Sequence, residues 1–149
     1  MFSSSLHPNI YYAYRARLEA LLLIPSTASD HDIHELIETG FTGDRVISLC
    51  EAGVISPTVR DQIIPYKTLK TRVARHQRLT ASESDRLFRV AHVISMAEAL
   101  FGDEDKARRW LAKFKSRFSG KSPFAMLSTT QGTHMVEEVL LQASEGFTF

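Results

Sequence analysis

One stretch of the sequence gathers basic and hydroxyl side chains that could bind phosphate groups. Its lysines and arginines are Arg60, Lys67, Lys70, Arg72, Arg75 and Arg78. Asp61 is the only acid among them, although the whole chain of 149 residues has a net charge of +1. Lysine and arginine attract nucleic-acid phosphates, and the hydroxyls of Thr68 and Thr71 can donate hydrogen bonds to them. A basic helix face that is merely solvated is the alternative interpretation. The candidate DNA-binding residues are Lys67, Thr68, Lys70, Thr71, Arg72 and Arg75.

Two short predicted helices position this stretch. Ser56-Pro57 is a cap followed by proline, which starts the first helix. Proline disfavours helical geometry in the residue before it, so Ile64-Pro65 predicts a tight turn and a second helix from Tyr66. In the second helix Tyr66, Leu69 and Val73 share one side, and the polar residues occupy the other. A helix, a tight turn and a basic helix in this order are typical of a helix-turn-helix module.

No residue set suited to catalysis or metal binding is evident. Glu137 and Glu138 are adjacent in a predicted helix, so they cannot face each other as a paired acid and base. His31 and His34 have helical spacing, but no further histidine or cysteine cluster completes a metal site. The sequence also lacks a glycine-rich phosphate loop. We therefore predict a binding protein that is not an enzyme and uses no cofactor.

Composition favours a cytoplasmic globular protein. Hydrophobic residues make up 44% of the chain, which is enough to form a core. The single cysteine, Cys50, excludes an internal disulfide and suits a reducing compartment, and we expect it to be an inert buried thiol. The longest apolar run, Leu21 to Ile24, is far too short to cross a membrane. The first residues have no basic and apolar leader, so we expect no membrane association.

Three helices are expected before residue 55. The first would run from a cap at Asn9 to about Ile24, and the others would cover residues 31–39 and 43–52. The inner side of the first helix is expected to consist of Ala13, Ala16 or Arg17, Ala20 and Leu21. Because no segment shows the alternation of a strand, the fold class is predicted to be all-α.

Four helices are expected in the C-terminal half. Thr80 and Glu83 form a capping box, which starts a helix of about 20 residues that ends at Gly102. The later helices are expected to begin at Asp103, at Ser122-Pro123 and after Gly132. Apolar stripes are formed by Leu87, Ala91, Ile94, Ala97 and Phe101, by Ala107, Trp110, Leu111 and Phe114, and by Val136, Val139, Leu140 and Ala143. Trp110 and Phe114 are predicted to be core residues.

The end of the chain carries two aromatic residues, Phe147 and Phe149, just after Gly146. The only charged side chains from Ser122 onward are acidic, and Glu145 is the last of them. An acidic, aromatic end could plug a basic cleft on a partner. Packing of the two phenylalanines on the helices, or fraying, is the alternative.

The C-terminal residues also resemble a known family. They have the order and spacing of the toxin-binding domain of Xre/MbcA/ParS-type antitoxins. The matching residues are Glu83 to Leu87, Ala91, Phe101 to Asp103, Lys106, Ala107, Trp110, Leu111, Gly120, Ser122, Pro123, Leu127, Thr129, Gly132, Val136, Glu137, Leu140, Gly146 and Phe147. The segment 66–72 is similar to the start of the recognition helix in these antitoxins, with lysine or threonine where the family has arginine. Lysine lacks the bidentate fork that suits guanine, so readout of bases is expected to be weak.

The resemblance implies an antitoxin of a RES-Xre pair. It would be a homodimer that binds a RES-domain, NAD-consuming toxin and represses its own operon by binding operator DNA. The C-terminal end would block the NAD site of the toxin with Glu145, Gly146, Phe147, Thr148 and Phe149. The expected organisation is an N-terminal tail and helix with a possible dimerisation role (1–29), a helix-turn-helix lobe (30–79) and a toxin-binding lobe (80–149). A stand-alone transcriptional regulator and an interaction adaptor without DNA binding are the alternatives.

Overall fold

The computed structural model describes residues 6–144, and every regular element in that range is a helix. The helices are α1 (Pro8–Leu22), α2 (Asp30–Thr39), α3 (Gly43–Glu51), α4 (Pro57–Ile63), α5 (Tyr66–Ala74), α6 (Ala81–Phe101), α7 (Glu104–Ala112), the 3-10 turn η2 (Ser116–Phe118), α8 (Pro123–Met126) and α9 (Thr130–Ser144). The predicted all-α class is confirmed. None of the helices in this range is both long enough and apolar enough to cross a membrane.

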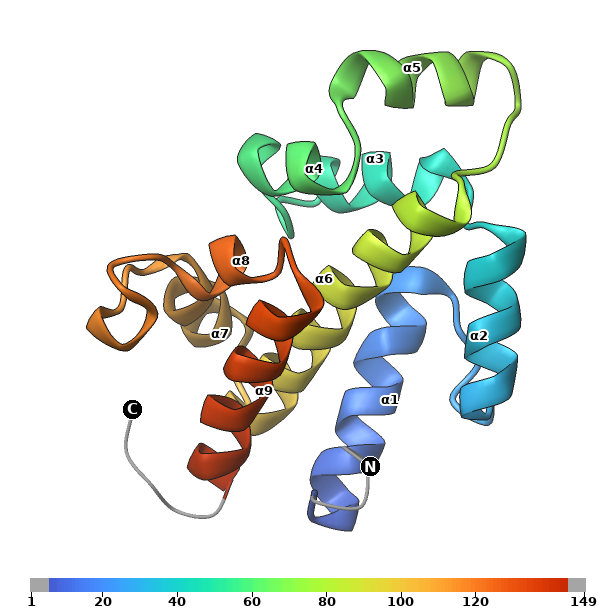
Figure 1. The fold of residues 1–149 in the computed structure, drawn as a ribbon. Coiled ribbons are helices and arrows are strands. Elements are labelled where there is room, and N and C mark those ends of the chain that lie inside the picture. The colour runs from blue at the N-terminus through green and yellow to red at the C-terminus, as the bar shows by residue number, and fades with distance from the viewer. Residues whose placement is uncertain (1–5, 145–149) are drawn as a thin grey trace.

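The long helix α6 is the axis of the molecule. It runs diagonally through the fold, with α1 and α2 on one side, α7 to α9 on the other, and α3 to α5 at its N-terminal end (Figure 1). The predicted capping box starts it: Thr80 Oγ1 accepts from the Glu83 N–H at 3.1 Å, and Glu83 Oε1 accepts from the Thr80 N–H at 2.8 Å. Gly102 ends it with a left-handed φ of 67°. These local interactions explain why both ends were predictable from the sequence.

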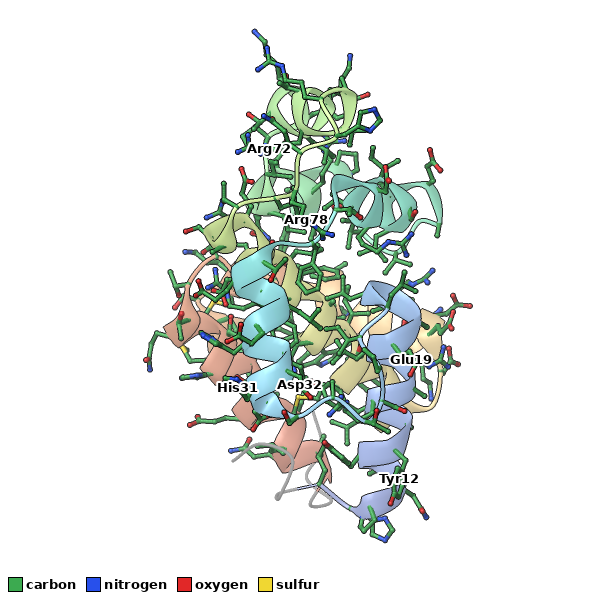
Figure 2. All side chains as sticks on the ribbon, turned by 90° about the vertical axis from the view of Figure 1, so that its right-hand side faces the viewer. Tyr12, Glu19, His31, Asp32, Arg72 and Arg78 are labelled. Carbon is green, nitrogen blue, oxygen red and sulfur yellow. The ribbon has the colours of Figure 1, made fainter. Side chains whose placement is uncertain are left out.

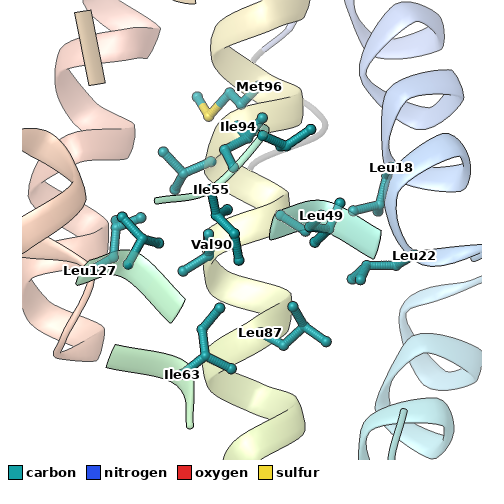
Figure 3. Close-up of a cluster of buried hydrophobic side chains, with 14 of the residues drawn as sticks. Leu18, Leu22, Leu49, Ile55, Ile63, Leu87, Val90, Ile94, Met96 and Leu127 are labelled. Atoms are coloured by element: carbon teal, nitrogen blue, oxygen red, sulfur yellow. The ribbon is translucent and has the colours of Figure 1, made fainter. Parts of the chain in front are cut away.

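Burial of α6 exceeds the single stripe that the sequence predicts. Besides Leu87, Ala91, Ile94 and Ala97, the helix buries Val90, His92, Val93, Ser95, Met96 and Glu98. Figure 3 shows Leu18 and Leu22 of α1 on one side of α6 and Leu127 on the other. Every residue from 90 to 98 is buried, so this half of α6 packs against neighbours on all sides. One hydrophobic core therefore joins the two halves of the chain.

The first helix differs from its prediction at its cap and at its inner face. His7 caps it, because His7 Nδ1 accepts from the Asn9 N–H at 3.2 Å and Pro8 takes the first helical position. The inner face consists of Tyr14, Arg15, Leu18 and Leu22 instead of the predicted alanine face. Arg15 is buried because its Nη2 donates to the carbonyl oxygens of Pro25 and Ala28, both at 2.9 Å. The prediction of the inner face was wrong because hydrophobic spacing does not count an arginine as a buried residue.

The second and third helices lie within one residue of their predicted bounds. Ser29 and Asp32 form a capping box at the start of α2, and Gly40 follows its last residue. Cys50 of α3 is half-buried and not fully buried as expected. Burial raises the pKa of its thiol, so the thiol remains protonated at neutral pH.

The start of α9 corrects the predicted role of Gly132. The helix begins at Thr130, so Gly132 lies inside its first turn and does not separate two helices. Thr129 Oγ1 accepts from the Gly132 N–H at 2.9 Å, as an N-cap side chain does. A Cβ atom at Gly132 would lie 1.9 Å from the Met126 carbonyl oxygen. Glycine is needed here for close packing of α8 against α9.

Candidate functional site

The two short helices and the tight turn predicted around residue 64 are present. Ser56 Oγ accepts from the Val59 N–H at 3.2 Å and caps α4. Ile64 then has an extended backbone, and Pro65 is the N-cap residue of α5. Leu69 is buried and attaches α5 to the core. The helix α5 is the outermost element at one end of the molecule (Figure 1).

The outer side of α5 carries most of the predicted DNA-binding residues. Lys67, Lys70, Thr71 and Arg75 are exposed, whereas Thr68 is half-buried. The Thr71 hydroxyl donates to the Lys67 carbonyl oxygen at 3.1 Å, so that proton is already used within the helix. Figure 2 shows side chains with nitrogen atoms at their tips extending outward from this end of the molecule. These residues are placed where a DNA backbone could reach them.

Tyr66 is not on the inner side of α5 as predicted, because its side chain is 51% exposed. The Arg60 guanidinium carbon lies 4.7 Å from the centre of the Tyr66 ring, and Lys70 Nζ lies 5.4 Å from it. Cations are attracted to aromatic faces, so the ring packs against both side chains, of which Lys70 is exposed and Arg60 is half-buried. Tyr66 therefore supports the basic surface that the sequence assigned to its neighbours.

Arg72 has a different environment from the other predicted DNA-binding residues. It lies on the inner side of α5 (Figure 2), where its Nη2 is 3.1 Å from Glu83 Oε2 and its Nε is 3.3 Å from Glu83 Oε1. Arg78 Nη1 donates to the Gly40 carbonyl oxygen at 2.9 Å, and Arg60 pairs with Asp61. The cations of this stretch that form neither an ion pair nor a side-chain hydrogen bond within residues 6–144 are Lys67, Lys70 and Arg75.

Glu83 fastens α5 to α6. Burial by itself would raise the pKa of this carboxyl, but the hydrogen bonds from the Thr80 N–H and from Arg72 outweigh burial and lower the pKa below its ordinary value. The carboxylate thus stabilises the fold in its ionised form. A carboxyl with a lowered folded-state pKa contributes stability above its unfolded pKa and loses it as the pH falls through the folded pKa.

We expect Glu83→Ala to lower the free energy of unfolding at pH 7 by about 2 kcal/mol, because it removes a cap and leaves Arg72 without its partner. The difference from the unmodified protein should shrink once the pH falls below about 4, where the carboxyl is protonated. Urea unfolding at pH 7 and pH 3 measures both effects. Glu38→Ala, which removes an exposed carboxylate on α2, is the control and should change stability by less than about 0.5 kcal/mol. An equal loss in the two variants would contradict the assignment.

A second candidate site is a concave surface in the C-terminal half, which we call the cationic cleft. It has a volume of about 810 Å³ and is formed by the end of α6, by α7, by residues 113–117 and by α9. Its lining residues are Phe101, Lys106, Arg109, Trp110, Lys113, Phe114, Lys115, Ser116, Arg117 and Val139. The lining contains five cations and no acid among the described residues. Such a cleft favours negatively charged partners.

The cationic cleft was missed by sequence reasoning because Phe114 was predicted to be core. Its side chain is 77% exposed, whereas Ala107, Trp110 and Leu111 of the same predicted stripe are buried. The reason is that α7 ends at Ala112, so Lys113 takes an extended backbone and Phe114 leaves the helical face. The six lysines and arginines between residues 106 and 117, five of which line the cleft, were the available clue in the sequence.

A hydrogen-bonded chain joins the first helix to the last through α6. The Tyr14 hydroxyl lies 2.6 Å from His92 Nδ1, and His92 Nε2 lies 3.2 Å from Glu137 Oε2. Burial raises the pKa of Tyr14 above its ordinary range, so its hydroxyl stays protonated and donates to His92. His92 Nε2 can then carry the proton that Glu137 accepts. Glu137 is thus a structural partner of His92, which agrees with the prediction that Glu137 and Glu138 do not act as a pair.

Residues Glu145, Gly146, Phe147, Thr148 and Phe149, the predicted toxin-binding end, lie outside the described residues. His31 pairs with Glu35 at 3.7 Å, and residues 6–144 contain no group of three or more histidine, cysteine or acidic side chains that could hold a metal ion.

Comparison with known proteins defines the class of this chain. Residues 96–146 match the family model described as the antitoxin Xre/MbcA/ParS C-terminal toxin-binding domain. This range includes all the residues that line the cationic cleft. The helical fold and this match together define an antitoxin with a toxin-binding domain.

A second comparison extends the match to nearly the whole chain. The protein named "Antitoxin Xre" from Pseudomonas putida (strain KT2440) is 56% identical over 147 residues, which cover 99% of this chain and 92% of the relative. The chain therefore belongs to the Xre antitoxin family. A toxin is accordingly a partner of this protein, and the role of the antitoxin is regulatory.

Proposed function

We propose that this antitoxin neutralises a RES-domain toxin that consumes NAD, and that it represses its own operon by binding operator DNA. The observation that carries the first part is the match of residues 96–146 to a toxin-binding domain. The matched range includes Glu145 and Gly146, the first two residues of the proposed inhibitory end. In this proposal Glu145 to Phe149 occupy the NAD site of the toxin, with the carboxylate toward its arginines and the two aromatic rings in adjacent apolar space.

The proposal divides the chain into two functional lobes. We propose that residues 30–79 form the DNA-binding lobe and residues 80–149 the toxin-binding lobe, with α6 shared between them. Operators with two-fold symmetry suit two-fold proteins, so the working form is proposed to be a homodimer in the cytoplasm. The first 29 residues are the proposed contributor to dimerisation, and Tyr12 and Leu23 of this part are 72% and 65% exposed.

The exposed basic surface of α5 supports the DNA-binding part of the proposal. Lys67, Lys70 and Arg75 are free of carboxylate partners among residues 6–144, so their charge is available to phosphates. Lysine offers a point charge instead of a bidentate fork, so phosphate contacts are expected to contribute more than base contacts. An interaction adaptor without DNA binding would show no dependence of DNA affinity on these three side chains.

The toxin-binding part is tested by co-expression with the RES-type protein proposed as its partner. The variants are the full chain, the chain ending at Ser144, and Phe147→Ala with Phe149→Ala. We expect the full chain to restore growth and cellular NAD, whereas the shortened chain should still bind the toxin in a pull-down but restore less than about a tenth of the NAD, because the helical surface is intact.

Each other outcome has a distinct meaning. Full rescue by the shortened chain would place inhibition in the helices and contradict the role of residues 145–149. Absence of both binding and rescue by the full chain would contradict the choice of a RES-domain partner. Operator binding without a toxin partner would favour the stand-alone regulator.

A further inference from the structure

The cationic cleft concentrates five positive charges, and two of them, Lys106 and Arg109, also interact electrostatically with the carboxylate of Asp103. None of its five cations, Lys106, Arg109, Lys113, Lys115 and Arg117, forms an ion pair with a carboxylate of residues 6–144. By contrast, nearby Arg108 lies 3.7 Å from Glu104. Like charges held together oppose the compact state unless an anion relieves them. The cleft therefore has the electrostatics of an anion site.

Aromatic rings stand among these cations. Phe114 is 77% exposed, and Lys115 Nζ lies 5.0 Å from the centre of the Trp110 ring. The rings of Phe101 and Trp110 are 6.0 Å apart between centres. Burial, together with the charge of Lys113, lowers the pKa of Lys115 below its ordinary value, so a bound anion would also stabilise the charged form of this lysine. A ligand that satisfies this lining needs both negative charge and a flat apolar part.

We propose that the cationic cleft binds a nucleoside phosphate. Lysine and arginine side chains hold phosphate oxygens, and an exposed aromatic ring such as Phe114 offers a stacking surface for a base. The volume of about 810 Å³ lies within the range of small-ligand sites. The base is assigned to Phe114, and the phosphates to the group of Lys113, Lys115 and Arg117.

This site is separate from the basic surface of α5. It lies at α7 and α9, away from α5, which forms the opposite end of the fold (Figure 1). The proposal does not depend on which toxin is bound, because ligand binding is measured on the antitoxin alone. Since the cleft lies within the matched toxin-binding range, a bound nucleotide would couple neutralisation to the nucleotide pool.

Trp110 gives a direct measurement, because it is the single tryptophan of the chain and lines the cleft. The full chain is titrated with ADP while tryptophan fluorescence is excited at 295 nm, and adenosine and inorganic pyrophosphate are titrated in parallel. We expect saturable quenching by ADP, with pyrophosphate about tenfold weaker because it lacks a base, and adenosine weaker still because it lacks phosphates. Phe114→Ala should weaken ADP about tenfold and leave pyrophosphate unchanged.

A charge-matched pair of variants provides the control. Lys113→Glu with Arg117→Glu should weaken ADP by at least about tenfold, whereas Lys67→Glu with Lys70→Glu on α5 should leave it unchanged. Circular dichroism verifies that both variants keep their helices. Three results would overturn the proposal: no saturable ADP binding, equal loss in the two variants, or pyrophosphate binding as tight as ADP. Quenching by an acidic peptide where ADP has no effect would overturn it in favour of a peptide site.

Discussion

Replacement of Gly132 by alanine should lower the free energy of unfolding by about 3 kcal/mol. The added Cβ would lie 1.9 Å from the Met126 carbonyl oxygen, 2.9 Å from the Met126 carbonyl carbon and 3.1 Å from Thr129 Oγ1. Two of these atoms are backbone and cannot rotate away, so α8 and α9 must separate. Alanine normally stabilises a helix interior by about 1 kcal/mol relative to glycine. The steric effect therefore has to reverse the usual sign.

Thermal and urea unfolding test this expectation. A loss of about 3 kcal/mol corresponds to a fall in Tm of about 6–12 °C for a chain of this size. Gly53→Ala is the matched control: its φ is +72°, but no atom lies within 4 Å of the added Cβ. Only the left-handed backbone is strained there, so the expected cost is about 1 kcal/mol. Equal effects at the two glycines, or a gain at Gly132, would contradict the close approach of α8 to α9.

The boundaries of the helices were largely predictable because they are set by neighbours in the sequence. Thr80 and Glu83 are three residues apart, and their capping box forms as expected. Ser56 caps α4 before Pro57, and Pro65 separates α4 from α5. A cap, a proline and a positive-φ glycine act over one helical turn, so the sequence specifies them without knowledge of the fold.

The buried faces were less predictable because they depend on residues far away in the sequence. Arg15 is buried only because the carbonyl oxygens of Pro25 and Ala28 turn toward it. From the sequence alone, Gly132 could end one helix and start another. Only the position of α8 shows that this glycine instead lets α9 approach the backbone of Met126. Hydrophobic spacing predicts the buried face of a helix from its own residues, whereas the observed burial depends on all the helices that pack around it.

The candidate sites show the same division. The exposed position of Lys67, Lys70 and Arg75 follows from the buried Leu69 on the opposite side of α5, so helical spacing sufficed. The cationic cleft combines α6, α7, residues 113–117 and α9, and its outline depends on where α7 ends. The environment of Arg72 depends on Glu83 of the next helix. The predicted DNA-binding residues therefore divide into four exposed residues, the half-buried Thr68, and Arg72, which is bound to Glu83.

The combined substitution Lys67→Ala, Lys70→Ala and Arg75→Ala should lower affinity for operator DNA by about 100-fold, because each side chain is expected to contact a phosphate. In a plot of the logarithm of affinity against the logarithm of salt concentration, the negative slope should become shallower by about 2.7. Each lost phosphate contact accounts for about 0.9 of this change. A fluorescence-anisotropy titration of the upstream region of its operon between 50 and 200 mM salt measures both quantities. The loss should be similar on unrelated DNA, because lysine contributes little base-specific recognition.

A second triple variant separates local from general charge effects. Lys106→Ala, Arg109→Ala and Lys113→Ala remove an equal number of positive charges from the cationic cleft, at the C-terminal end of α6. If α5 enters the DNA groove, this variant should keep the salt slope of the unmodified protein and lose less than about twofold in affinity, since charges beyond a Debye length are screened. Arg72→Ala should reduce the free energy of unfolding through the loss of the Glu83 contact while leaving the salt slope unchanged. Equal losses from the two triple variants would show that DNA responds to net charge alone, and the helix-turn-helix assignment would then fail.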